Sequence, residues 1–275
     1  MAAVLLLGNG INRFSADYSW DTLVDHLIGG YGSGKISKAE KPFTLLYEEI
    51  LSRAFREELI KDETELLSFI AKETEKIEPN NFHNLVLKNY STILTTNYDY
   101  AVEKAAAGSG GPFDSETRET RYSLYRRIDA KGTSVWHIHG EAGYPRTICL
   151  GYEHYSAYIQ TMRNRLIKQD IERKKDPGGN SPGTWMDYFF DADIDIIGLS
   201  LDFVESDLWW LIIHRSRLIN SGRAERKNRI RYFIKKNADY DAKTKAKIQM
   251  LEANNIDLAE IDGKDYAGFY EKCFG

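Results

Sequence analysis

Residues that can bind ligands or transfer protons follow four short runs of apolar and β-branched residues. The runs and the residues after them are Val4 to Leu7 with Gly8-Asn9-Gly10, Thr92 to Thr95 with Thr96, Asn97 and Asp99, Ser134 to Ile138 with His139-Gly140, and Ile194 to Ile197 with Gly198-Leu199-Ser200. Such runs are typical of strands buried in a parallel sheet. Because parallel strands end at one shared edge, where open α/β sheets bind ligands, the pattern predicts a site there.

Two histidines at the end of the third run allow two interpretations. His137 and His139 would lie on one face of a strand, and two imidazoles so placed can bind a metal, with Glu153 and His154 as the nearest further ligands in the sequence. Those two residues are not at a helpful spacing. We therefore interpret His137 as structural and His139, beside a glycine at the strand end, as an acid or base.

The Gly8-Asn9-Gly10 turn allows a phosphate to approach the backbone, because glycine accepts positive φ and has no side chain. The usual dinucleotide fingerprint has a third glycine three positions further on, where this chain has Arg13. A tight strand-to-helix turn without a ligand is the alternative. Arg13 could contact a phosphate or brace the loop.

Composition narrows the class of protein. The 275 residues are 42% hydrophobic and 28% charged with a net charge of −4, which is ordinary for a globular protein and makes nucleic acid an unlikely partner. Two cysteines, Cys149 and Cys273, cannot form a four-cysteine zinc site. The run from Ala2 to Leu7 is too short for a signal peptide, and no run reaches about 20 apolar residues, so we expect a cytoplasmic protein without a membrane span.

The pattern as a whole predicts an α/β protein with a Rossmann-like open parallel sheet, helices on both faces and an inserted helical subdomain. We expect one domain over residues 1–275, with three helices inserted at about 41–90 and a flexible joint at 29–35. Further strands are expected at 121–128, 229–234 and 258–261. Further helices are expected at 20–27, 100–107, 206–218, 242–254 and 266–274, and residues 149–155 should lead into a long helix that reaches about Lys175.

The order and spacing of these motifs resemble the sirtuin superfamily. The residues that carry the resemblance are Gly8-Asn9-Gly10-Ile11-Asn12, Thr95-Thr96-Asn97-Tyr98-Asp99, His139-Gly140 and Gly198-Leu199-Ser200. The chain is most similar to divergent bacterial sirtuin-like proteins that hydrolyse NAD, many of them effectors of anti-phage defence. The resemblance implies NAD as the substrate and no metal.

Roles are carried over from the family by position. The resemblance implies that Gly8 and Gly10 hold the pyrophosphate, with Asn9, Asn12, Arg13 and Thr96 as further contacts to the dinucleotide. Asn97 and Asp99 would lie at the nicotinamide ribose and carboxamide, and His139 would be the catalytic base. Gly198 and Ser200 would contact the adenosine side.

Two departures from the sirtuin deacylases alter what the resemblance implies. The chain cannot build their four-cysteine zinc ribbon, and Arg13 and Phe14 follow the glycine loop where deacylases have a longer segment. We therefore expect an NAD glycohydrolase that releases nicotinamide and ADP-ribose as a defence effector. The alternatives are an NAD or ADP-ribose sensor without catalysis, or a protein ADP-ribosyltransferase or deacylase.

The residue types fit this chemistry. Nicotinamide in NAD is a cationic leaving group, so its departure leaves an oxocarbenium-like sugar and needs little acid assistance. Asn97 can orient ribose hydroxyls or water, Asp99 can stabilise positive charge, and a neutral His139 can accept a proton from water. A homo-oligomer or a regulatory protein partner is also expected, with contacts through the helical insertion or the helix of Trp209 and Trp210.

Overall fold

The computed structural model describes residues 3–15, 19–32, 34–108, 121–175 and 183–275, and for 169–175 only the helical backbone. The described strands are β1 (Val4–Leu7), β2 (Thr92–Thr95), β3 (Ile128–Ala130), β4 (Thr133–His137), β5 (Ile194–Ile197), β6 (Ile230–Lys235) and β7 (Asp257–Ile261). They form one sheet in the order β3-β4-β2-β1-β5-β6-β7. All neighbours are parallel except β3, which runs antiparallel to β4 at the edge.

Both faces of the sheet are covered, and this explains the uninterrupted apolar runs. Along β1, Val4 and Leu6 pack into the core on one face, while Leu5 and Leu7 pack into the core on the other. All four side chains are buried. Alternation between two buried faces removes the polar positions that a half-exposed strand would show.

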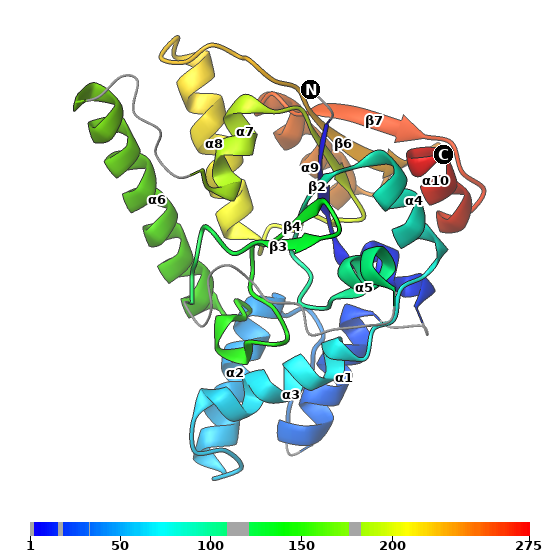
Figure 1. The fold of residues 1–275 in the computed structure, drawn as a ribbon. Helices are drawn as coiled ribbons and strands as arrows, with labels where there is room; N and C mark the ends of the chain where they lie inside the picture. The colour runs from blue at the N-terminus through cyan, green and yellow to red at the C-terminus, as the bar shows by residue number, and fades with distance from the viewer. Residues whose placement is uncertain (1–2, 16–18, 33, 109–120, 176–182) are drawn as a thin grey trace.

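Helices form three groups around the sheet (Figure 1). One face carries α6 (Tyr152–Lys175), α7 (Tyr188–Asp191), α8 (Ser206–Asn220) and α9 (Ala242–Ala253), and the other carries α4 (Asn81–Asn89), α5 (Ala101–Ala107) and α10 (Tyr266–Phe274). The third group is α1 (Trp20–Tyr31), α2 (Phe43–Arg56) and α3 (Glu63–Glu75). Short 3₁₀ turns are η1 (Asn9–Phe14), η2 (Pro145–Thr147) and η3 (Trp185–Asp187). The predicted Rossmann-like α/β fold, with an open and mostly parallel sheet covered by helices, is confirmed.

The helical layer, defined as α1, α2 and α3, lies over the carboxyl edge of the sheet. Its core includes Tyr98 and Tyr100, which follow β2, and Ile148 and Leu150, which come after β4. Of the three helices expected at 41–90, α4 does not join this layer. It packs through Phe82 and Val86 against the sheet face, so the layer is completed by α1 instead.

Two local expectations are wrong. Residues 121–127 do not form a strand: Tyr122 has a φ of +65°, and only Ile128 belongs to β3. Tyr122 and Leu124 pack in the core beside α6, so their apolar character reflects burial in a loop rather than strand alternation. The expectation of a flexible joint at 29–35 is also wrong at its start, because Gly29 and Gly30 lie within α1.

The apolar helix α8 is explained by packing within the chain. Trp209 is buried in the same core as β5 and β6, and Trp210 packs against that core with its indole stacked on His214.

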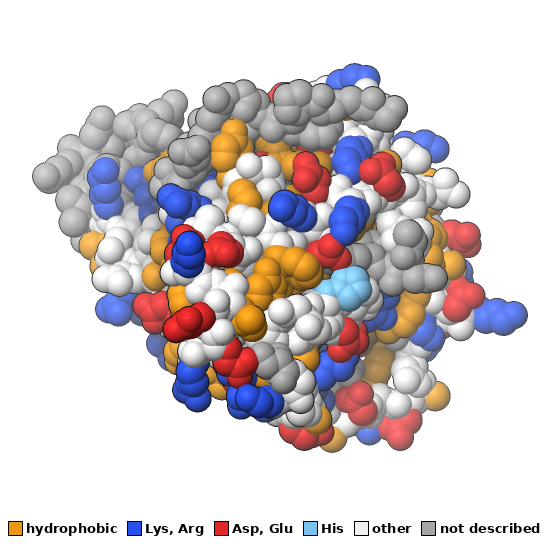
Figure 2. All heavy atoms as spheres, turned by 90° about the horizontal axis from the view of Figure 1, so that it is seen from below, with side chains coloured by type: hydrophobic (Ala, Val, Ile, Leu, Met, Phe, Trp, Pro, Cys, Tyr) orange, Lys and Arg blue, Asp and Glu red, His pale blue; other side chains and the backbone are white. Residues whose placement is uncertain are grey.

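The face at the end of the helical layer carries acidic and basic side chains side by side, with small apolar patches between them (Figure 2). Among the described residues, no helix combines the length and apolar character that crossing a bilayer requires.

Glycines after β1 allow the loops of β1 and β5 to touch. A β-carbon on Gly8 would lie 2.4 Å from the Leu199 Cα, and one on Gly10 would lie 2.7 Å from the Gly198 carbonyl oxygen. The Gly10 amide donates to that carbonyl at 2.8 Å, and Gly198 itself has a φ of +70°. Side chains at these positions would force the two loops apart.

We expect Gly8→Ala to lower the free energy of unfolding by about 1–3 kcal/mol, because the added methyl overpacks a backbone contact. Gly30→Ala is the matched control: it is exposed in a helix with open space around it, and it should stabilise the fold by about 0.5–1 kcal/mol. Urea denaturation of both variants measures the difference. Equal stability of the two variants would contradict the close loop contact.

Candidate active site

The ends of β2 and β4 are joined by one buried histidine. Thr95 and His137 are paired in register, and the His137 ring nitrogen Nδ1 lies 2.9 Å from the backbone oxygen of Asn97. The other ring nitrogen, Nε2, lies 2.7 Å from Glu103 Oε1 on α5. Burial would lower the pKa of His137, but the charge and hydrogen bond of Glu103 raise it to about 9. His137 therefore has a structural role, because it links the Asn97 backbone to Glu103 on α5.

His139 follows two residues later and faces a different carboxylate. Its Nε2 lies 2.8 Å from Asp207 Oδ2, in the first turn of α8, and both side chains are almost fully buried. The rings of Tyr155 and Tyr158 on α6 pack edge-on against the imidazole. If Nε2 carries the proton donated to Asp207, Nδ1 remains available as a base, and the carboxylate stabilises the imidazolium after proton transfer.

Asp99 connects the β2 loop to the β1 loop. Its Oδ1 accepts from the Ala101 amide at 2.9 Å, and its Oδ2 accepts from Asn12 Nδ2 at 2.7 Å. Asn12 also donates to Asn9 Oδ1 at 2.7 Å. Burial raises the pKa of Asp99, although these hydrogen bonds act in the opposite direction. Both carboxylate oxygens of Asp99 thus hold the two loops in place.

Four buried acceptor oxygens at this edge have no hydrogen-bond partner among the described residues. They are Asn12 Oδ1, Asn97 Oδ1, Glu205 Oε2 and Asp207 Oδ1. Buried polar atoms are normally paired, and an orphaned one costs about 1–3 kcal/mol. A group of unpaired acceptors is suited to a ligand that brings several hydroxyl or amide donors.

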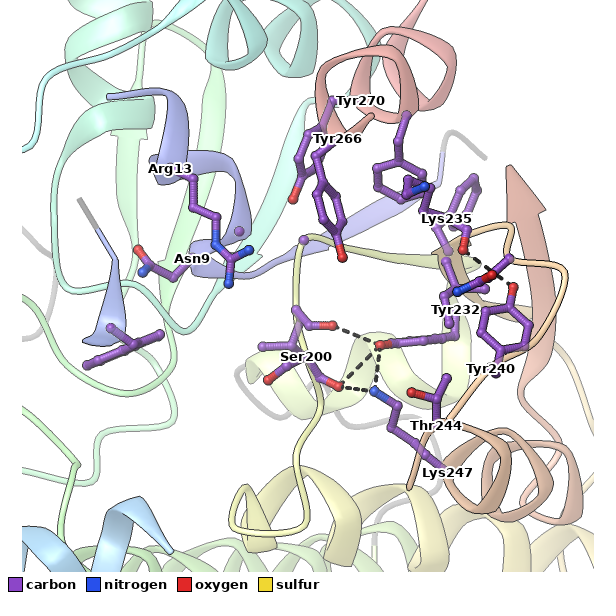
Figure 3. Close-up of a pocket in the computed structure, with 18 of the residues that line it drawn as sticks. Asn9, Arg13, Ser200, Tyr232, Lys235, Tyr240, Thr244, Lys247, Tyr266 and Tyr270 are labelled. Carbon is purple, nitrogen blue, oxygen red and sulfur yellow. Dashed lines mark hydrogen bonds between the residues drawn. The ribbon is translucent and has the colours of Figure 1, made fainter. Parts of the chain in front are cut away.

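A cavity of about 530 Å³ opens over the ends of β1, β5 and β6, and Glu205 is the member of this group that belongs to its described lining. This is where the chain order reverses: β2 extends the sheet on one side of β1, and β5, β6 and β7 extend it on the other. Asn9 and Arg13 enter the cavity from the β1 loop, and Thr244 and Lys247 enter it from α9 (Figure 3). Tyrosines from three elements complete the wall: Tyr232, Tyr240, Tyr266 and Tyr270.

The wall contributed by α9 is fixed to the β5 loop. Lys247 Nζ donates to the Ser200 backbone oxygen at 2.6 Å, and the Tyr232 hydroxyl donates to the same oxygen at 3.1 Å (Figure 3). The ammonium also lies 5.3 Å from the centre of the Tyr232 ring. Because of these contacts, the Ser200 carbonyl is occupied within the fold.

The structure brings only part of the predicted residue set to the cavity surface. The predicted residues that line it are Asn9, Gly10, Arg13, Gly198 and Ser200. The predicted residues that are not part of its described lining are Gly8, Asn12, Thr96, Asn97, Asp99 and His139. The amides of Gly8 and Gly10 already donate to the Ile197 and Gly198 carbonyls, so these glycines serve loop contact within the fold.

Glu205 and Asp207 are functional candidates that the sequence analysis missed. Glu205 lines the cavity, and Asp207 carries the hydrogen bond to His139. Burial and the charge of Asp207 raise the pKa of Glu205 to about 8. In the sequence both look like acidic residues at a helix start, where they are common. Their position shortly after the loop that follows β5 is the sequence feature that could have identified them.

Residues 91–175 match the family model of the SIR2-like domain. The matched part contains β2, Asn97, Asp99, β4 and His139. This segment of the chain is similar to that domain. A comparison with curated proteins gave no match.

The match to the SIR2-like domain fits an NAD-dependent activity in the broad sense. The loops after β1 and β5 lie outside the matched residues, so the cavity is described by the structure alone. The described residues contain no group of three or more His, Cys, Asp or Glu side chains that could hold a metal. His137 and His139 instead pair with separate carboxylates.

Removing the charge beside His137 should destabilise the protein in a pH-dependent way. Because the folded pKa of His137 is raised from 6.5 to about 9, its contribution is fully present below pH 6.5 and is lost as the pH rises through 9. We expect Glu103→Gln to lower the free energy of unfolding at pH 6 by about 3 kcal/mol, and by less at pH 9.5.

The matched control is Glu73→Gln, which removes a carboxylate that lies 2.8 Å from the half-exposed His26 and also pairs with the exposed Lys76. An exposed pair contributes about 0–1 kcal/mol, so this variant should change little at either pH. Chemical denaturation at both pH values measures the two variants. A loss for Glu103→Gln that does not depend on pH would show that His137 is not charged in the fold.

Proposed function

We propose that this sirtuin-like protein is an NAD glycohydrolase that cleaves the bond between nicotinamide and ribose. The main support is the set of unpaired buried acceptors on the loops after β1, β2 and β5, of which Glu205 lines the cavity, together with the His139–Asp207 pair. The nicotinamide ribose and carboxamide of NAD carry several hydroxyl and amide donors, which complement acceptors rather than other donors. The dinucleotide would lie across the ends of β1, β5 and β6.

The nucleotide half of NAD has suitable partners along the cavity. Arg13 offers a guanidinium that can bind pyrophosphate oxygens through two donors, and Asn9 offers an amide. The tyrosine-rich wall between β6, α9 and α10 offers flat rings for a purine. Gly8 and Gly10 would contribute by keeping the β1 loop close to the β5 loop.

The proposed reaction uses Asn97, Asp99 and His139. Nicotinamide leaves with the electron pair of its bond to the anomeric carbon, and a water oxygen forms the new bond. The proton lost by that water passes to His139, and Asp207 stabilises the resulting imidazolium. Asn97 orients the ribose or the water, and Asp99 acts mainly by holding Asn12 and the β1 loop.

Hydrolysis is preferred over protein deacylation because the chain has only two cysteines and cannot form the zinc ribbon of the deacylases. We propose further that the enzyme depletes NAD in defence. We also propose that it acts as a homo-oligomer or with a regulatory protein partner. One sirtuin-like domain spanning the chain, with its helical layer as an insertion, is the organisation that we propose.

We predict that Asn97→Ala and His139→Ala each abolish NAD consumption while the fold survives. Asp207→Asn should lower kcat by on the order of 100-fold or more, because it removes the charge that stabilises protonated His139. Chromatography of the products formed by purified protein measures nicotinamide and ADP-ribose. His26→Ala, at a half-exposed site on α1, serves as the matched histidine control and should keep full activity.

The outcomes separate the possible activities. Free ADP-ribose from the wild type and none from the two alanine variants supports the proposal. Saturable NAD binding without turnover, with and without candidate partner proteins, would instead indicate a sensor. Transfer of labelled ADP-ribose to a protein acceptor would indicate a transferase. Wild-type turnover in either alanine variant would reject the assigned residues.

A further inference from the structure

The β5 loop places a second acidic side chain in the wall of the cavity. Glu205 is the N-cap residue of α8, but its side chain makes no capping hydrogen bond. Ser, Thr, Asp and Asn are the residues that cap well, because their side chains are short enough to reach back to the helix amides. Glu205 instead lines the cavity, and its Oε2 is buried without a hydrogen-bond partner among the described residues.

The surroundings of Glu205 favour an uncharged carboxyl group. Asp207 lies two residues away with its Oδ1 also unpaired, and burial together with the charge of Asp207 raises the pKa of Glu205. A hydrogen bond from the Asp202 backbone lowers this pKa, and the negative charge of Asp202 raises it to a smaller degree. Lys247 is the cation that faces it, and this ammonium already donates to Ser200 and Tyr232. The other titratable groups that interact with it are the hydroxyls of Tyr155 on α6 and Tyr232 on β6.

An uncharged carboxyl group differs from a carboxylate in what it can bind. It offers one O–H donor and one acceptor, whereas a carboxylate only accepts. A sugar hydroxyl also donates and accepts, so the two groups can exchange a pair of hydrogen bonds. A phosphate oxygen only accepts hydrogen bonds, so it could form a single hydrogen bond, from the carboxyl O–H.

We propose that Glu205 is a substrate-binding residue that holds a ribose hydroxyl of the dinucleotide with its uncharged carboxyl group. The identity of the ligand rests on the proposed function, but the role of Glu205 does not require turnover. Asp207 binds the His139 ring, and Glu205 binds the sugar. The start of α8 thus contributes two acidic side chains with different roles.

The test is calorimetric titration of ADP-ribose into the full chain at pH 6.5 and pH 8.5. Glu205→Gln keeps one donor and one acceptor without a titratable proton, so it should bind within about threefold of the wild type at pH 6.5. The affinity of the wild type should fall between pH 6.5 and pH 8.5. This loss should be several-fold larger than the loss for Glu205→Gln, because the variant shows only the effect of the other titrating groups. Glu205→Ala should bind on the order of tenfold more weakly at pH 6.5.

The matched control is Glu252→Gln on α9, an exposed acid that does not line the cavity, and it should bind like the wild type. If Glu205→Ala binds as the wild type does, Glu205 does not touch the ligand. If Glu205→Gln is as weak as Glu205→Ala at pH 6.5, a charged carboxylate is required. Either result overturns the proposal. If Glu205→Ala does not fold, the pH comparison with Glu205→Gln decides it.

Failure of the two proposals can be told apart. Glu205-dependent binding of ADP-ribose without NAD cleavage rejects the hydrolase and leaves this inference standing. Cleavage of NAD with binding that is independent of Glu205 rejects this inference and leaves the hydrolase standing.

Discussion

The contact between His137 and the backbone oxygen of Asn97 is the interaction on which the site depends. It joins the ends of two neighbouring parallel strands at the point where β-sheet hydrogen bonding stops. Glu103 on α5 supplies the charge that keeps the imidazole in place. With β2 and β4 fixed in this way, Asn97 and His139 leave the sheet at the same edge. The catalytic proposal depends on this shared edge more than on any single side chain.

Much of the fold could be predicted because its strands are buried on both faces. The four apolar runs became β1, β2, β4 and β5, and the expected helices appeared with ends shifted by a few residues. Prediction failed where burial did not follow a regular element. Tyr122 and Leu124 belong to a loop that packs beside α6. The spacing of apolar residues in the sequence does not distinguish such a buried loop from a buried strand. Gly29 and Gly30 likewise lie in a helix that tertiary packing stabilises despite their low propensity.

The site was predictable only where chemistry and strand ends coincide in the sequence. Asn97, Asp99 and His139 stand directly after strands, so their meeting follows from a parallel sheet. Asp207 is different, because it reaches His139 through the packing of α8 against the sheet. The tyrosine wall depends on β6, α9 and α10 approaching the β5 loop, a contact between segments far apart in sequence. Residue types alone carry little information about such contacts.

Tyr98 lies between the two site residues of the β2 loop, yet its side chain belongs to the core of the helical layer, where its ring meets Trp20. Its hydroxyl also donates to the Cys149 carbonyl, in the segment that leads from β4 to α6. One tripeptide, Asn97-Tyr98-Asp99, is therefore shared by two structural units. A shortened protein that keeps every strand but lacks α1 to α3 would lose the hydrophobic support of this tripeptide. The layer is thus an integral part of the scaffold that supports the site.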